Sequence, residues 1–331
     1  MTFLMYFRTK TQKKLFFVMR TKNWLTSVPN FFEKFDENKF YLVELIEQGD
    51  SYILGEISSE EYDSIMLSNQ AIFEYEYFNR KVKEIDLNLE DFLNIHGKYS
   101  FEMANMHHSE DTIPGLMDEA FININRTFVN YINSCRIFID HMEGKIKGKY
   151  GENSKNYKVF DKAKKYCYNT YFSYKFFYHL RNYAEHVNFP VYNINKSTSW
   201  KTINDLEKPV TEFKVFFNKD KLLESKYMSS KLKMELKYRN TLFPVLPVIE
   251  EFKKPINYML NTLLKVEAEY YVENANILMS FSNKSIYGGK VEIGKFSREN
   301  GQIGYSPASP HVKIIEDIRA SLSKLDSIVN Y

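Results

Sequence analysis

The segment 178–186, which reads YHLRNYAEH, carries side chains that could act on a phosphodiester. Histidine exchanges protons near neutral pH, so His186 could serve as a general acid or base. Arginine can hold a phosphate with paired hydrogen bonds and offset the charge that develops in the transition state, which suits Arg181. The amide of Asn182 could orient an attacking or leaving oxygen. Together these residues predict a site that cleaves or binds a phosphodiester.

Helical geometry predicts that these groups share one side of a helix. At 100° per residue, Arg181, Asn182 and His186 fall within an arc of about 140°. Tyr174, Lys175 and Tyr178 project into much the same sector, and tyrosine rings can stack on unpaired bases. The apolar side chains of the segment gather on the opposite face: Phe176, Phe177, Leu180, Tyr183 and Ala184.

The same residues also have simpler interpretations. Arg181 and Glu185 are spaced i and i+4 and could form an ion pair on the helix surface. His186 lies near a helix C-terminus, where a histidine can serve only as a partner of the helix dipole. A functional site therefore requires that both groups reach the surface instead of being sealed in packing.

Two long helical patterns must position these residues. The first starts at Thr112 and Pro114, and Gly144 and Gly148 are expected to end it. Its apolar residues recur at steps of three and four: Met117, Ala120, Ile124, Phe128, Tyr131, Cys135, Phe138 and Met142. The second pattern, capped by Asn153 or Ser154, continues to about His186, and Pro190 stops it. Two long helices joined by a short loop are expected to pack as an antiparallel hairpin.

The flanking sequence predicts smaller mixed elements. The chain is expected to be mainly α, with residues 1–110 forming a mixed α/β region, 111–275 a helical domain, and 276–331 a β-hairpin with a helix. Within these regions we expect a hairpin over 40–46 and 51–54, a short helix capped at 58–61, strands over 71–77 and 212–217, helices over 220–238 and 249–276, strands within 290–305, and a last helix over 312–329.

Composition excludes several classes of protein. Apolar residues make up 44% of the chain, which is enough to bury a core. The net charge is only +3, so any nucleic-acid contact must come from a local patch. Cys135 and Cys167 are too few for a disulfide framework or a zinc site and indicate a reducing compartment. The apolar start, 1–7, lacks a charged leader, and no run is long enough for a membrane helix. We therefore expect a cytoplasmic protein without membrane contact.

The spacing Arg181-Asn182-x-x-x-His186 resembles the R-N-x-x-x-H signature of HEPN domains, helical bundles found in many bacterial defence and toxin ribonucleases. The aromatics before the arginine and the Pro-Val pair 190–191 also resemble one bacterial branch. The preceding helix, which ends in 140–143, is similar to the helix that packs against the HEPN motif. The resemblance covers roughly 113–200, and extends to 275 if the helix from Ile249 completes the bundle.

The resemblance implies a metal-independent endoribonuclease without a cofactor. In such enzymes the ribose 2′-hydroxyl attacks the adjacent phosphate and leaves a cyclic phosphate and a 5′-hydroxyl. Carried over, His186 is the general acid or base, Arg181 stabilises the phosphorane, and Asn182 orients groups around it. The family also implies a homodimer with the site where two motif helices meet. A toxin or abortive-infection effector, acting on RNA and controlled by an antitoxin or a phage-derived trigger, would fit these features.

Further contacts remain open. A polar residue on the preceding helix often assists a HEPN site, and Asn130 and Asn133 are both candidates. The lysines of 145–165 could touch an RNA backbone or form a solvated helix junction, and His179 could belong to the site. Residues 107–111, HHSED, are interpreted as a solvated loop and not as metal ligands.

Two other functions compete with the ribonuclease. A non-catalytic HEPN module could bind nucleotides or a partner protein, although it would not need all three motif residues. A nucleic-acid-binding regulator could use the flanking regions, but no recognisable reading element is present. The chain also offers an internal comparison, because Arg239-Asn240 repeats the dipeptide with Pro244 in place of the histidine.

Overall fold

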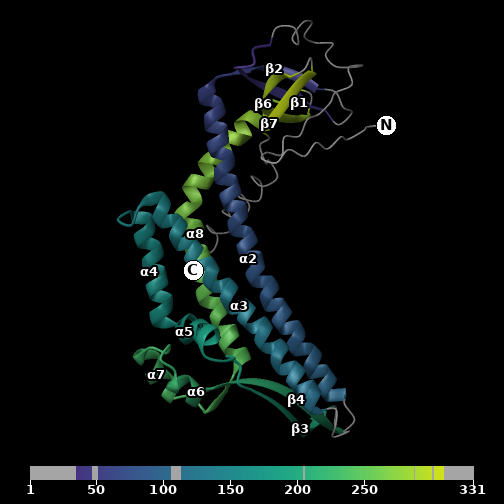
Figure 1. Ribbon diagram of the computed structural model, residues 1–331, viewed down its shortest axis with the longest axis vertical. Helices are drawn as coiled ribbons and strands as arrows, with labels where there is room; N and C mark the ends of the chain where they lie inside the picture. The colour runs from purple at the N-terminus through teal and green to yellow at the C-terminus, as the bar shows by residue number, and fades with distance from the viewer. Residues whose placement is uncertain are drawn as a thin grey trace. The chain divides into compact units, whose positions relative to one another are not determined.

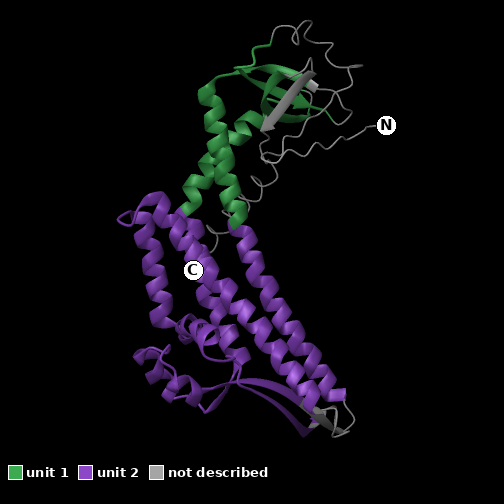
Figure 2. Ribbon diagram, viewed as in Figure 1, with its two compact units in different colours: residues 1–77, 267–331 green, residues 78–266 purple. Residues whose placement is uncertain are grey.

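The computed structural model describes most of the chain and shows a mainly helical protein with small antiparallel sheets (Figure 1). The described residues are 35–46, 51–105, 113–203, 206–286, 288–299 and 302–308. The chain divides into two compact units: unit 1 contains 1–77 and 267–331, and unit 2 contains 78–266 (Figure 2). These boundaries differ from the three consecutive regions expected, because unit 1 is assembled from both ends of the chain.

Unit 1 contains a four-stranded antiparallel sheet with the order β2-β1-β6-β7. Its strands are β1 (Phe40–Leu45), β2 (Ser51–Ile57), β6 (Lys290–Glu299) and β7 (Gln302–Ala308). The predicted first hairpin and late strands are confirmed. Strand β6 pairs with β1 across almost the whole length of the sequence, which no local pattern could indicate. The helix expected over 312–329 lies outside the described residues.

A buried carboxylate stabilises the turn into β6. Glu44 of β1 is fully buried. It accepts hydrogen bonds from the Ser285 hydroxyl at 2.6 Å and from the backbone N–H groups of Ile286 and Gly289 at 3.0 and 2.6 Å. Through these hydrogen bonds, Glu44 joins the two ends of the chain within the unit.

Helices α2 (Ser59–Asn105) and α8 (Val245–Ser282) contribute residues to both units. The predicted cap of α2 is confirmed, because Ser58 and Glu61 exchange side-chain and backbone hydrogen bonds as a capping box. Helix α2 is long, whereas only a short helix was expected at this cap. The strand predicted over 71–77 is wrong, since this segment lies inside α2. Helix α8 is longer at both ends than the predicted 249–276.

The failed strand prediction has a clear cause in the burial pattern. The segment alternates apolar and polar residues, which favours a strand. However, Ala71, Ile72, Tyr75 and Phe78 are buried, at the steps of three and four that a helix face requires, while Phe73 is 50% exposed. Both periods were present in the sequence, and the packing selected the helical one.

The described residues of unit 2 form five further helices and a three-stranded sheet with the order β3-β4-β5. The helices are α3 (Ile113–Tyr150), α4 (Lys155–Thr170), α5 (Phe172–His186), α6 (Lys219–Glu224) and α7 (Ser230–Lys237). The strands are β3 (Asn193–Ile203), β4 (Leu206–Asn218) and β5 (Leu242–Pro244). The single helix expected over 220–238 is therefore wrong: α6 and α7 are separate, and each has its own cap, from Asn218 and Ser229 respectively.

The first predicted long helix, α3, is confirmed. All of its predicted apolar residues from Ala120 to Met142 are buried. Its predicted end is wrong, because Gly144 and Gly148 lie inside the helix. Gly151 ends it instead: its φ is +81°, and its N–H bonds to the carbonyl of Lys147 at 2.9 Å. A glycine reaches this left-handed conformation without steric cost.

The second predicted long helix is in fact two helices. Ser154 caps α4, accepting from the N–H of Tyr157 at 3.1 Å. Tyr171 then adopts an extended conformation, with φ −103° and ψ 122°, and separates α4 from α5. No proline or glycine marks this break in the sequence. The break redirects the chain before the motif, so α5 carries the candidate residues alone.

An aromatic core holds α5 in unit 2. Phe128 of α3 lies at its centre, with ring centroids 5.7 Å from Phe92 of α2, 5.6 Å from Phe177 of α5 and 5.6 Å from Phe217 of β4. The Phe177 ring also meets Phe252 of α8 at 4.7 Å. Buried aromatic pairs contribute large apolar areas and fix the relative rotation of the elements they join.

Candidate active site

The predicted motif stands at the C-terminal end of α5. The helix is anchored by its apolar face, where four predicted residues are buried: Phe176, Phe177, Leu180 and Tyr183. The N–H of Val187 bonds to the Tyr183 carbonyl at 2.9 Å and closes the last turn. Pro190, which has no N–H to donate, follows as predicted. The polar side of the motif is therefore presented by a helix that is fixed from its other face.

A buried amide of α3 fixes the chain just beyond the motif. Asn125 is fully buried, and its side chain donates to the Val191 carbonyl at 3.0 Å and accepts from the Val191 N–H at 2.9 Å. Both backbone groups of a buried residue are thereby satisfied. Sequence reasoning did not single out Asn125, although it lies one residue after Ile124 of the predicted apolar stripe. This contact fixes the exit of α5 on α3.

Arg181 is held from two sides. Its Nε donates to Oδ1 of Asn133, on α3, at 3.3 Å, and its Nη2 lies 2.9 Å from Oε1 of Glu185. The simple i,i+4 ion pair expected as an alternative is therefore present. The Arg181 side chain is still 30% exposed. A guanidinium has five N–H groups, and no partner among the described residues takes the others.

His186 is exposed and stacked on a ring from a distant segment. Its imidazole lies 5.2 Å from the Tyr227 ring, with 26° between the planes. Tyr227 belongs to the turn between α6 and α7, where its N–H bonds to the Ser225 hydroxyl at 3.2 Å. Sequence reasoning missed Tyr227, and no local signal relates it to the motif. The stack limits the rotation of the imidazole while leaving it open to solvent.

His179, two turns before His186, is half-buried. Its Nε2 lies 2.9 Å from the hydroxyl of Tyr168, on α4. Burial lowers the pKa of His179, although a hydrogen bond with the Tyr227 backbone opposes this shift. Its contact with Tyr168 on α4 gives His179 a structural position between two helices. Tyr227 thus touches both histidines of α5.

The structure separates the asparagine candidates. Asn133 contacts Arg181, whereas Asn130 is exposed and has no hydrogen bond to the motif among the described residues. Asn182 is half-buried, and its amide makes no hydrogen bond within the described part of the chain. Asn133 is therefore the α3 residue that the geometry favours as a support for Arg181, and Asn182 keeps an amide available at the same helix end.

Among the predicted substrate contacts, Tyr178 is the one from α5 that reaches the surface. It is 38% exposed, and the guanidinium carbon of Arg136, on α3, lies 4.2 Å from its ring centroid. Arg136 also pairs with Asp140 at 2.9 Å. A second arginine, which sequence reasoning did not consider, therefore lies one turn away from the contact between Asn133 and Arg181.

Tyr174 and Lys175 are buried, which corrects their assignment as substrate contacts. Their exposed fractions are 3% and 2%. Burial raises the pKa of Tyr174. Lys175 forms an ion pair with Glu235 of α7. Both side chains belong to the packing between α5 and its neighbours.

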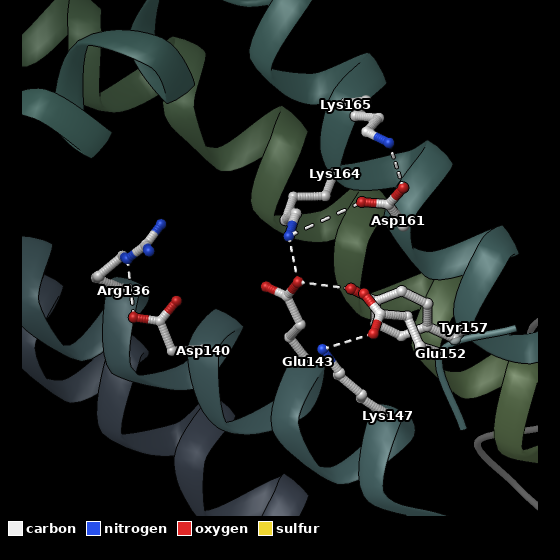
Figure 3. A network of polar contacts seen from close by, with 9 residues as sticks. All are labelled: Arg136, Asp140, Glu143, Lys147, Glu152, Tyr157, Asp161, Lys164 and Lys165. Carbon is white, nitrogen blue, oxygen red and sulfur yellow. Dashed lines mark hydrogen bonds and ion pairs between the residues drawn. The ribbon is translucent and has the colours of Figure 1, made fainter. Parts of the chain in front are cut away.

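Three lysines at the junction of α3 and α4 are ion-paired with carboxylates of the same region (Figure 3). Glu143 lies between Lys164, to which it is ion-paired, and the Tyr157 hydroxyl at 3.1 Å. Lys165 pairs with Asp161, and Lys147 with Glu152. For the three paired lysines, these contacts support the interpretation of this region as a helix junction.

The remaining residues considered as candidates in the sequence are packed against other parts of the chain or lie outside the described residues. Arg239, of the repeated Arg-Asn pair, lies over the Phe172 ring at 3.6 Å, and burial lowers its pKa. Cys135 and Cys167 are buried free thiols, and burial raises the pKa of Cys167 to about 12, which does not suit a nucleophile. Residues 107–111 lie outside the described residues. Across the described ranges, no group of three or more histidine, cysteine or acidic side chains is arranged to hold a metal ion.

Comparisons of the chain with protein-family models, with curated proteins and with solved structures found no match. Within the described ranges, none of the helices combines the length and the apolar character needed to cross a membrane.

Proposed function

We propose that this protein is an endoribonuclease whose site is the C-terminal end of α5. One observation carries the proposal: Arg181 and His186 both reach the surface at one end of the same anchored helix. Arg181 is supported by Asn133 and His186 by the Tyr227 ring. These residue types at this spacing resemble the HEPN ribonuclease signature. Both side chains are therefore accessible to solvent, and each is held in place by a contact with another part of the chain.

The proposed reaction needs only proton transfer and charge stabilisation. A base removes the proton from the ribose 2′-hydroxyl, and the 2′-oxygen forms a bond to the adjacent phosphorus. The bond from phosphorus to the 5′-oxygen breaks, and an acid protonates the leaving oxygen. His186 is assigned the proton transfer, Arg181 the negative charge on the phosphorane, and Asn182 the orientation of an oxygen. The products are a 2′,3′-cyclic phosphate and a 5′-hydroxyl.

Helical spacing favours a site shared between two copies. Arg181 and His186 are five positions apart, which corresponds to about 7.5 Å along the helix axis and about 140° around it. A second motif helix could bring another imidazole, so that one histidine accepts a proton and the partner's His186 donates one. Exposed apolar side chains next to the motif support such a contact: Val187, Phe189 and Tyr192 are 52, 47 and 42% exposed.

A biochemical assay tests this proposal directly. The purified full chain is incubated with labelled single-stranded RNA in EDTA, and the cleaved ends are identified by mass. We expect a 2′,3′-cyclic phosphate, and no cleavage of a strand with a 2′-deoxy nucleotide at the scissile position. General acid–base catalysis contributes about 10²–10⁴-fold, so His186→Ala should lose at least about 100-fold in rate.

Two matched substitutions control for nonspecific effects. His141→Ala removes an exposed histidine from α3, and Arg126→Ala removes an exposed arginine from the same helix. Both proteins should cleave at the unsubstituted rate, whereas Arg181→Ala should not. Native-rate cleavage by His186→Ala would refute the assigned mechanism.

The proposed biological role is a toxin or anti-phage effector that acts in the cytoplasm and is controlled by an antitoxin or a phage-derived trigger. This role is inferred from the same resemblance to HEPN ribonucleases. Induced expression of the unsubstituted protein should halt bacterial growth and degrade RNA, and sequencing of the cleaved ends would give its specificity. Arg181→Ala and His186→Ala should abolish both effects at equal protein level.

A non-catalytic HEPN module that binds nucleotides or a partner protein is the second candidate. It is favoured by the fact that both motif groups already have partners within the chain, Glu185 for Arg181 and Tyr227 for His186. Such a module should bind without cleaving. Purified protein that forms a stable complex but leaves every RNA intact, with or without a trigger, would select this function.

A further inference from the structure

Helices α3 and α5 make two matched contacts beside the motif. Arg181 of α5 donates to Asn133 of α3, and Arg136 of α3 lies over the Tyr178 ring of α5. Asn133 and Arg136 are three residues apart on one helix, and Tyr178 and Arg181 are three apart on the other. Side chains at this spacing lie on the same helix face. The second contact therefore extends the surface around Arg181 by one turn.

Each of the two arginines has its own carboxylate four residues later. Arg181 pairs with Glu185 and Arg136 with Asp140, and both distances are 2.9 Å. The exposed fractions are 30 and 34% in the first pair and 24 and 41% in the second. Intrahelical ion pairs at such partly exposed positions contribute little to stability, so they can be exchanged for other anions without loss of the helices.

The second arginine has a fixed platform. The Tyr178 ring beneath its guanidinium also meets the Tyr168 ring of α4 at 5.8 Å, edge to face. One turn earlier on α5, Tyr174 is buried, and its hydroxyl has no hydrogen-bond partner among the described residues. Burial raises the pKa of this phenol, Arg136 opposes the shift and Asp140 adds to it, so the charged pair lies close to it. Arg136 therefore rests on a packed aromatic surface.

We propose that Arg136, held on the Tyr178 ring, forms a second phosphate subsite for the RNA strand whose scissile phosphate meets Arg181. Arginine binds phosphate through a planar fork of N–H groups and stacks on aromatic faces, and the Arg136 contact provides the stacking. The two contacts are about 4.5 Å apart along the helix axis. Asp140 and Glu185 occupy the arginines in the free protein, and the phosphates displace them on binding.

The identity of the ligand as RNA rests on the proposed ribonuclease function, but the subsite can be tested by binding alone. The full chain with His186→Ala is titrated against fluorescent single-stranded RNA by anisotropy at several KCl concentrations. Adding Arg136→Ala should weaken binding about tenfold or more, as expected for loss of a charge-assisted hydrogen bond. It should also reduce the slope of log affinity against log salt by about 0.7, the value for one phosphate on a single strand.

Two further substitutions separate binding from general charge or misfolding. Arg126→Ala removes the same charge from α3, where the Arg126 side chain is exposed and bonds only weakly to Asn123, at 3.5 Å. It should leave the affinity and the salt slope nearly unchanged. Asp140→Asn should tighten binding several-fold, because the competing carboxylate is lost. Loss of folded protein lowers the apparent affinity, so a gain from Asp140→Asn keeps the test valid if Arg136→Ala fails to fold.

The outcomes separate the two proposals. Equal effects of Arg136→Ala and Arg126→Ala, or no gain from Asp140→Asn, would overturn the subsite, as would the absence of RNA binding. If the unsubstituted chain cleaves RNA but Arg136→Ala does not change the affinity for RNA, the ribonuclease proposal is retained and the subsite is refuted. Conversely, Arg136-dependent binding by a protein that never cleaves RNA would support the subsite and refute the ribonuclease.

Discussion

Asn125 and Val191 form a closed pair of hydrogen bonds that ties the exit of α5 to α3, at 3.0 and 2.9 Å. Substituting Asn125 with leucine keeps a side chain branched at Cγ but leaves the N–H and C=O of Val191 buried and unpaired. Each unpaired group costs about 1–3 kcal/mol, so the free energy of unfolding should fall by at least about 2 kcal/mol. Urea denaturation measures the change, and Asn105→Leu, at an exposed position of α2, is the control. An equal loss in both variants would contradict the importance of this pair.

Asn133 and Asn130 should differ in their effect on RNA cleavage. Asn133 accepts from Arg181, so Asn133→Ala should let the guanidinium move and lower the rate about tenfold, as expected for loss of a hydrogen bond to a charged group. Asn130→Ala should stay close to the unsubstituted rate. Rates with labelled RNA give the comparison, and circular dichroism verifies the fold of each variant. A larger loss from Asn130→Ala would show that the other candidate assists the site.

The buried ion pair of Lys175 and Glu235 predicts unequal effects of its two substitutions. Lys175→Met replaces a 2% exposed ammonium with an apolar chain of similar length and should be nearly neutral or stabilising. Glu235→Ala leaves the ammonium buried without its partner. Breaking a fully buried pair costs about 3–5 kcal/mol, and the cost here should be smaller because Glu235 is 35% exposed.

Thermal and urea unfolding of both variants test this order. Lys175→Met should also retain RNA cleavage, because the side chain is sealed in packing. If Lys175→Met folds and loses cleavage, the ammonium contributes to the site despite its burial.

Stability should decrease in mild acid because of His96. The imidazole packs against the Phe213 ring at 5.4 Å, its Nε2 is buried and has no hydrogen-bond partner among the described residues, and burial lowers its pKa from 6.5. The unfolded chain therefore binds a proton more tightly than the folded one. The stabilising contribution is present above about pH 6.5 and is lost as the pH falls through the folded pKa.

Urea unfolding between pH 8 and pH 5 measures this effect. His96→Phe should show a smaller loss of stability over that range than the unsubstituted protein. Phe213→Leu, which weakens the packing but keeps the imidazole, should be less stable at every pH and retain the pH dependence. Identical pH profiles for His96→Phe and the unsubstituted chain would exclude His96 as the cause.

Gly289 should not tolerate a side chain. A Cβ at this position would lie 2.4 Å from the Leu45 carbonyl oxygen and 2.9 Å from Cγ of Glu44. Gly289→Ala should therefore displace β6 from β1 and destabilise unit 1 by about 1–3 kcal/mol. Faster hydrogen exchange in β1 and β6 would report the change. Gly144→Ala, in open space within α3, should instead stabilise the protein by about 0.5–1 kcal/mol.

Predictions from the sequence succeeded where a short-range pattern decides the structure. The α3 stripe from Ala120 to Met142 recurs at helical spacing, and each of its members is buried. The hairpin of β1 and β2 follows from two apolar runs around a short turn. These features depend on neighbours within a few residues, so they can be inferred without knowing the rest of the fold.

Predictions failed where two patterns competed or where the packing supplied the signal. Segment 71–77 fits both a strand and a helix, and burial of Tyr75 and Phe78 with exposure of Phe73 shows which one the core selects. The break at Tyr171 contains no proline or glycine. The end of α4 and the start of α5 could therefore not be predicted from the sequence, because the helical periodicity continues on both sides of Tyr171.

The sequence by itself determined that Arg181, Asn182 and His186 share one side of a helix, because a fixed rotation per residue decides this. Tertiary structure decided which groups meet them. Asn130 and Asn133 are one turn apart on similar faces of α3, and only the rotation of α3 against α5 brings Asn133 to Arg181. Tyr227 reaches His186 because the chain returns through a sheet and a short helix. Such contacts depend on packing between distant segments, whose energies are not encoded in any local spacing.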